Sequence, residues 1–102
     1  MQKETVFKHK VLHFMRTLPH TWVTKIQQVV IRGTPDILAC IRGTFVAIEL
    51  KSTEDSVIAA LQVFNLDSIK KAGGISLVIT PETWFNDKKF LEDLANNHRE
   101  IY

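Results

Sequence analysis

Two apolar runs separated by only two residues constrain the fold of this chain more than any other feature. Residues 36–41 and 44–51 have the composition of strands, and the pair Arg42-Gly43 between them is typical of a tight β-hairpin. Such a short loop fixes the register, with Ile41 facing Thr44. Counting outward predicts that Asp36 stands opposite Glu49. Lys51 then lies on the same face as Glu49, because side chains alternate along a strand.

The segment before the hairpin divides into a helix and a strand. Apolar residues recur at helical spacing over residues 3–18, until Pro19 interrupts the pattern. The β-branched residues of 22–31 then predict a strand, which ends at the turn residues 32–35.

The segment after the hairpin predicts a βαβ crossover and a last helix. Ser52 has the spacing of a helix start, and the helix is expected to run to Ala72 and stop at Gly73-Gly74. Residues 75–80 form an uncharged apolar run, suited to a strand buried on both faces in parallel pairing. Pro81 is expected in the first turn of the final helix. The order helix, three strands, helix, strand, helix predicts an α/β fold with a mixed sheet flanked by helices.

Composition favours one domain over residues 1–102 in an intracellular setting. A 45% hydrophobic content supports a single core, and a net charge of +2 is too balanced to indicate nucleic-acid binding by itself. The single cysteine, Cys40, lies in an apolar run and is expected to be a buried, inert thiol, which favours a reducing compartment. No apolar stretch reaches the roughly 20 residues that span a bilayer, so no membrane association is expected.

The charged residues at the hairpin end form a candidate catalytic site. Facing residues have Cβ atoms about 4.5 to 5.5 Å apart, so Asp36 and Glu49 can share one cation. Mg²⁺ prefers one or two carboxylates and takes other ligands from water and phosphate, and the backbone carbonyl of Leu50 can add a ligand. Lys51 would orient a metal-bound water or stabilise charge on the transition state. The pattern therefore predicts phosphodiester hydrolysis with Mg²⁺ or Mn²⁺.

Taken singly, each of these residues has a simpler explanation. Lys51 can be a solvated surface charge, Glu49 a solubilising charge at the end of an apolar strand, and Asp36 a turn residue after Pro35. The register that brings the three together favours the catalytic interpretation.

The ordered set of motifs resembles the PD-(D/E)XK nuclease superfamily and is most similar to its virus-type replication-repair nuclease (VRR-NUC) family. The resemblance implies that Asp36 and Glu49 bind the metal and that Lys51 serves catalysis. It also implies a supporting role for Gln62 on the following helix and a match of Glu4 to the family's helix-one glutamate. It rests on these residues and on the segments Gly33-Thr34-Pro35-Asp36, Glu49-Leu50-Lys51 and Lys71-Ala72-Gly73-Gly74.

Gln62 and Glu4 also have simpler explanations. Gln62 lies on the largely apolar stripe of its helix, where a hydrogen-bonded glutamine at the edge of the core is an equal alternative. Glu4 lies close to the start of the sequence and can be a solvated first-turn acid.

Contacts with DNA are expected from basic and polar residues near the site, since such groups neutralise or hydrogen-bond phosphates. A solvated amphipathic face explains the basic residues of the first helix equally well. The histidines lack a zinc-ligand spacing with Cys40, and there is no glycine-rich phosphate loop, so neither structural zinc nor a nucleotide cofactor is expected. The candidate DNA-binding residues are Lys8, Arg32, Thr34, Lys70 and Lys71.

The sequence thus predicts a metal-dependent DNA endonuclease, and the resemblance implies branched or four-way junction DNA as its substrate. One alternative is a catalytically silent, nuclease-like module for DNA binding or assembly, which the intact Asp36, Glu49 and Lys51 disfavour. Another is a restriction-type endonuclease, which a chain with little spare length disfavours.

A homodimer is expected as the working unit. So small a chain offers little surface to a branched substrate, and closed two-fold dimers are the commonest homo-oligomers. The resemblance also implies a dimer. The alternative is that the aromatic residues proposed for the interface pack inside the monomer. These candidates are Phe14, Trp22, Trp84, Phe85 and Phe90.

Overall fold

The computed structural model describes residues 3–27, 32–52 and 58–97. For Lys3 and Glu4 only the backbone is described. None of the described helices combines the length and the hydrophobicity of a membrane-spanning segment. The order helix, three strands, helix, strand, helix is confirmed. The elements are α1 (Lys3–Arg16), β1 (Thr21–Lys25), β2 (Ile37–Ile41), β3 (Thr44–Leu50), α2 (Ala60–Lys71), β4 (Ile75–Ile79) and α3 (Trp84–Asn96).

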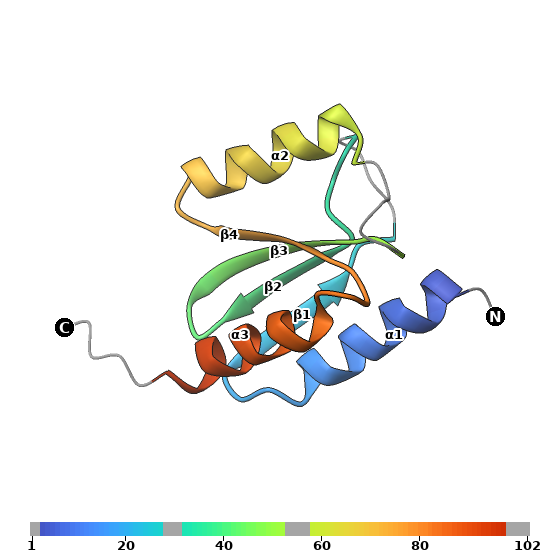
Figure 1. Ribbon diagram of the computed structural model, residues 1–102. Coiled ribbons are helices and arrows are strands. Elements are labelled where there is room, and N and C mark those ends of the chain that lie inside the picture. Colours follow the sequence, from blue (N-terminus) through green and yellow to red (C-terminus); the bar gives the residue numbers. More distant parts are fainter. Residues whose placement is uncertain (1–2, 28–31, 53–57, 98–102) are drawn as a thin grey trace.

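The strands form one mixed sheet, in the order β1-β2-β3-β4, between two helical layers (Figure 1). Strands β1, β2 and β3 pair antiparallel, and β4 pairs parallel to β3. A parallel neighbour requires a crossover connection, which α2 provides on one face of the sheet. Helices α1 and α3 cover the other face (Figure 1).

The hairpin between β2 and β3 has the predicted register. Ile41 pairs with Thr44, and the ladder continues to Ile37 opposite Ile48. Arg42 and Gly43 have φ values of 50° and 84°, as a type I′ turn requires at both central positions. The Arg42 side chain, whose Nε donates to the Ala95 carbonyl at 2.9 Å, also ties the turn to the end of α3.

This register assigns alternate residues of the hairpin to opposite faces. One set lies in the core against α1 and α3 and is almost wholly buried. Glu49 belongs to the other set, on the face where α2 packs. The core residues of the two strands are Ile37, Ala39, Ile41, Val46, Ile48 and Leu50.

Three predicted boundaries are wrong. Strand β1 ends at Lys25 because β2 offers only five residues for pairing, and positions 28–31 of the expected strand lie outside the described residues. Helix α2 begins at Ala60 rather than Ser52, since Ala59 has an extended backbone. Positions 53–57 of the expected helix are not described.

The third wrong boundary is the start of α3. The helix begins at Trp84, because Thr80 and Thr83 exchange hydrogen bonds that build a turn ahead of it. Pro81 therefore lies in this turn and not in the first turn of the helix. Side-chain hydroxyls that bond to nearby backbone compete with helix formation in this way.

Two predictions of burial are also wrong. Cys40 is exposed, because it points away from the α1/α3 core. Strand β4 is at the edge of the sheet, and Val78 on its α2 side is partly exposed, so the strand is not buried on both faces.

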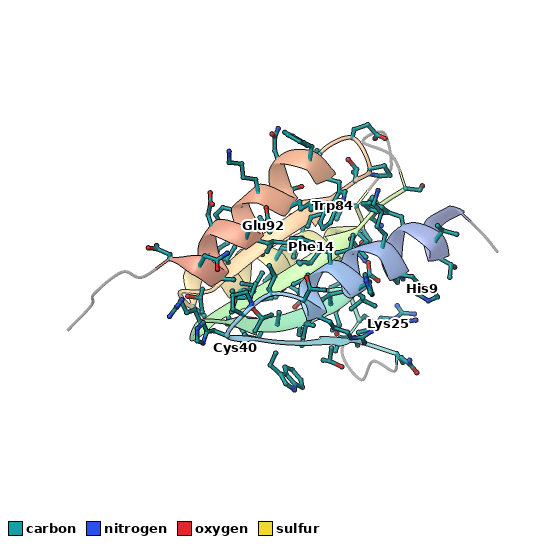
Figure 2. The ribbon with its side chains drawn as sticks, turned by 90° about the horizontal axis from the view of Figure 1, so that it is seen from below. His9, Phe14, Lys25, Cys40, Trp84 and Glu92 are labelled. Carbon is teal, nitrogen blue, oxygen red and sulfur yellow. The ribbon has the colours of Figure 1, made fainter. Side chains whose placement is uncertain are left out.

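Trp84 and Phe64 give a test of this packing. Trp84 is 7% exposed and makes an edge-to-face contact with Phe14 at a centroid distance of 5.4 Å (Figure 2). It makes a second such contact with Phe7 at 6.2 Å. Phe64 on α2 is 65% exposed. Trp84→Ala should lower the free energy of unfolding by about 3 to 5 kcal/mol in urea denaturation. The matched change Phe64→Ala should alter it by no more than about 0.5 kcal/mol. Equal losses in the two variants would contradict the assignment of Trp84 to the core.

Candidate active site

Glu49 is the most buried charged group of the site. It lies next to the last residue of β3, on the α2 face, and is 2% exposed. Its Oε2 accepts a hydrogen bond from Gln62 Nε2 at 2.7 Å and lies 3.4 Å from Lys51 Nζ. Its Oε1 is buried and receives no hydrogen bond from the described residues. One oxygen of this carboxylate is therefore anchored, and the other lacks a partner within the described structure.

Asp36 joins the strands at the same end of the sheet. It precedes β2 by one residue, so the ladder stops one pair short of the predicted Asp36/Glu49 pairing. Its side chain bonds to β3 instead: Oδ2 accepts from the Leu50 N–H at 2.8 Å. Its backbone carbonyl accepts from the Ile26 N–H, also at 2.8 Å. Its second carboxylate oxygen, Oδ1, lies 3.6 Å from Lys8 Nζ.

Gln62 connects the start of α2 to the strand end. Besides donating to Glu49, its side chain accepts a hydrogen bond from the Ala59 N–H at 3.3 Å, and its Oε1 lies 3.5 Å from Lys51 Nζ. The expected helical stripe is confirmed, because Leu66 is buried while Gln62 and Asn65 are partly buried beside it. The same amide thus begins the helix and orients Glu49.

The loop before Asp36 packs directly on the backbone of α2. Gly33 has a φ of +78°, and a Cβ there would lie 2.7 Å from the Leu61 carbonyl carbon and 2.9 Å from the Gln62 nitrogen. Asn65 Nδ2 also donates to the Arg32 carbonyl at 3.0 Å. Only glycine fits both this conformation and this approach, so Gly33 sets how closely Gln62 lies to the strand end. Sequence reasoning assigned no such positioning role to Gly33 or Asn65, although the G-x-P-D pattern and the helical stripe contain both.

Burial is the largest influence on the pKa of Glu49. It raises the pKa of Glu49 above the ordinary value, and the nearby Asp36 carboxylate raises it further. Lys51 and the Gln62 hydrogen bond act in the opposite direction but do not cancel these effects. The Asp36 carboxylate bonds to the N–H of Leu50, the residue that follows Glu49, which places the two carboxylates at the same strand end.

The donor set fits a hard divalent cation. Glu49 Oε1 receives no hydrogen bond from the described residues. Among those residues, the group paired with Asp36 Oδ1 is the Lys8 ammonium. Within the described ranges no cluster of three or more His, Cys, Asp or Glu side chains that could hold a metal is present. Mg²⁺ and Mn²⁺ suit such a site, because hard cations accept few protein oxygens and complete their shell with water or phosphate. The Leu50 carbonyl as a ligand stays a prediction, and the Glu4 side chain lies outside the described residues.

The expected DNA-binding residues divide into two groups. Lys8 reaches the site itself, and Arg32 and Thr34 belong to the loop that leads to Asp36. Lys70 and Lys71 are exposed in the last turn of α2, about 12 Å along the helix from Gln62 at 1.5 Å per residue. The structure therefore does not bring these two lysines to the carboxylates.

Comparison with known proteins identifies the fold in which these residues lie. No family model matches the sequence, and no curated protein matches it. Among solved structures, one described as a "VRR_NUC domain protein" superposes with a TM-score of 0.73, covering 92% of this chain and 91% of that chain at 14% identity. The chain has a VRR-NUC-like fold. The predicted fold resemblance is confirmed, and at this identity the likeness concerns the fold alone.

Within this VRR-NUC-like fold, the residues chosen from the motifs converge. Asp36, Glu49, Lys51 and Gln62 meet at one end of the sheet, through the contacts described above. Sequence reasoning missed that Lys8 pairs with Asp36. A signal was present, because Lys8 precedes the buried residues Val11, Leu12 and Met15 by three, four and seven positions on the same side of α1.

The raised pKa of Glu49 predicts how the stability of the metal-free protein depends on pH. Because the folded protein holds this proton more tightly than the unfolded chain, stability should fall as pH rises from below the ordinary value of 4.5 through the raised pKa. Glu49→Gln removes the buried charge. With a chelator present, the variant should lose this pH dependence and show a higher Tm than the parent at neutral pH. A lower Tm for the variant at neutral pH would mean that the Lys51 ion pair outweighs desolvation.

Proposed function

We propose that this chain is an endonuclease that hydrolyses phosphodiester bonds in DNA with Mg²⁺ or Mn²⁺. The observation that carries the proposal is the arrangement of the two carboxylates. Each has one oxygen fixed by protein donors, at Leu50 N–H or at Gln62 Nε2, and one oxygen without such an anchor. The VRR-NUC-like fold supports a nuclease-type hydrolase.

The protein groups around the proposed cation have separable roles. The bound cation would polarise the scissile phosphate and lower the pKa of a water molecule. Asp36 and Glu49 would hold it through Oδ1 and Oε1, while Leu50 N–H and Gln62 keep the carboxylates oriented. Lys51, partly exposed and 3.5 Å from Gln62 Oε1, would orient the attacking water or stabilise negative charge on the phosphate.

Branched DNA, including four-way junctions, is the substrate class that we propose. One support is the motif resemblance. The other is the position of Lys8, Arg32 and Thr34, which would let a phosphate approach the carboxylates from the side of the loop that leads to Asp36. Lys70 and Lys71 would contact DNA farther from the cut.

Cleavage should require the divalent cation and both carboxylates. With Mg²⁺ or Mn²⁺, the protein should cut four-way junction or flap DNA faster than plain duplex, and EDTA should abolish cutting. Asp36→Asn and Glu49→Gln should each lower the rate by at least about 100-fold. Lys51→Met should lose turnover but keep Mn²⁺ binding in calorimetry. Asp67→Asn, which neutralises an exposed carboxylate of α2, is the matched control and should retain activity.

The outcomes separate enzyme from binding module. DNA binding without cleavage of any substrate, in either metal, would identify a catalytically silent module. Unchanged Mn²⁺ binding in Glu49→Gln would show that the metal site is elsewhere.

A homodimer is the assembly that we propose for this activity. Two of the expected interface residues, Phe14 and Trp84, pack against each other between α1 and α3 (Figure 2). Trp84 is buried, and Phe14 is partly buried, so both have less surface to offer a partner than the other three. Trp22, Phe85 and Phe90 are exposed, at 65%, 80% and 42%. Exposed aromatic residues are enriched at protein interfaces, so these three remain the candidates.

Light scattering at micromolar concentration should therefore give the mass of two chains. Trp22→Ser or Phe85→Ser should shift the mass toward one chain while the circular dichroism spectrum stays unchanged. A monomeric mass for a preparation with full junction-cutting activity would refute the dimer and leave the catalytic assignment intact.

A further inference from the structure

Lys8 occupies an unusual position for a lysine. It lies on the side of α1 that also carries the buried Val11, Leu12 and Met15, and its side chain is only 22% exposed. A lysine at such a position keeps its stem against apolar surface and its ammonium near a counter-charge. That counter-charge is Asp36 Oδ1, at 3.6 Å.

The contact involves the particular carboxylate oxygen that a metal would use. Asp36 Oδ2 is committed to the Leu50 N–H, so Oδ1 is the oxygen left for a cation. At Glu49 the equivalent oxygen, Oε1, receives no hydrogen bond from the described residues. The Lys8 ammonium therefore holds a position where a divalent cation would bind.

Among the described side chains of the metal-free site, the charges balance when Glu49 is ionised. Asp36 and Glu49 then carry two negative charges, and Lys8 and Lys51 carry two positive charges. A divalent cation would leave the site with two excess positive charges, of which one DNA phosphate removes only one. Electrostatic repulsion would then act on the two ammonium groups at short range.

The two lysines differ in how firmly they are held. Lys51 contacts both Glu49 and Gln62 from the end of β3. Within the described structure, Lys8 makes the Asp36 ion pair and no other ion pair or hydrogen bond. Of the two ammonium groups, Lys8 therefore has the fewer contacts with described residues.

We propose that Lys8 is the resident counter-cation of Asp36, that a divalent metal displaces it from Oδ1, and that the freed ammonium then binds a DNA phosphate. This inference rests on the proposed metal-dependent nuclease function. It makes Lys8 a positioning residue that couples metal binding to DNA binding. By linkage, each ligand then raises the affinity for the other through the same group.

Calorimetry of Mn²⁺ binding to the DNA-free protein tests the displacement. Lys8→Met removes the competing ammonium and should bind Mn²⁺ about 10-fold more tightly than the parent, a typical coupling between two ligands. Lys10→Met makes the same change of net charge from an exposed position on α1 and should stay within about two-fold. Lys8→Arg keeps the charge and should resemble the parent. Weaker binding in Lys8→Met, or a change equal to that of Lys10→Met, would overturn the displacement.

DNA binding tests the second half of the proposal. With a phosphorothioate four-way junction that resists cleavage, Lys8→Met should weaken binding in Mn²⁺ but leave it unchanged in EDTA, where Lys8 is engaged by Asp36. The same weakening in both conditions would make Lys8 an ordinary phosphate contact and contradict the coupling.

These results can be told apart from failure of the proposed function. If the parent binds no Mn²⁺ in calorimetry, both the function and this inference fail. If the parent binds Mn²⁺ and cuts DNA while Lys8→Met behaves like Lys10→Met, only the role of Lys8 is refuted. Circular dichroism melting in EDTA verifies that each variant is folded.

Discussion

The register of the β2/β3 hairpin is the constraint on which the rest of the structure depends. With Ile41 opposite Thr44, Ile48 and Leu50 enter the core and Glu49 between them faces α2. A slip of one residue would exchange the two faces, placing a carboxylate among aliphatic side chains and turning Leu50 toward the polar groups of α2. The free energy that favours burial of the apolar residues therefore also fixes the position of the acidic site.

Burial of the Glu49 carboxylate disfavours its ionised form, and the neighbouring groups offset this effect only in part. Burial and the Asp36 charge raise the pKa of Glu49, while Lys51 and Gln62 favour its ionised form. Acids whose pKa is raised by burial and by a neighbouring carboxylate are common at functional sites, where a ligand or cation supplies a compensating interaction. In the metal-free state, Lys51 pairs with Glu49 and Lys8 pairs with Asp36, and we propose that the second pairing gives way to the metal.

The position of α2 brings polar groups to the end of β3. The helix approaches the loop that leads to Asp36 so closely at Gly33 that a side chain there would overlap the backbone at Leu61 and Gln62. Asn65 holds the same loop through the Arg32 carbonyl. These contacts bring the Gln62 amide within 2.7 Å of Glu49. The fold thus positions its polar groups by backbone packing rather than by long side-chain networks.

The sequence by itself determined the hairpin, the order of the elements and the convergence of Asp36, Glu49 and Lys51. These follow from a two-residue turn and from alternation along a strand, which are local properties that a sequence records directly. The helix face on which Gln62 lies was also predicted correctly, because helical spacing assigns this residue to the stripe that packs against the sheet.

Only the tertiary structure decided which aromatic residues are buried, where α2 begins, and which partner Lys8 has. Trp22 and Trp84 are alike in the sequence, yet one lies exposed on a strand and the other lies between two helices. Cys40 lies in an apolar run but points to a face that leaves it exposed. The Lys8–Asp36 pair joins a helix to a loop 28 positions later. Such contacts depend on how the layers pack, and the periodicity of a segment records which of its sides is apolar but not what that side meets.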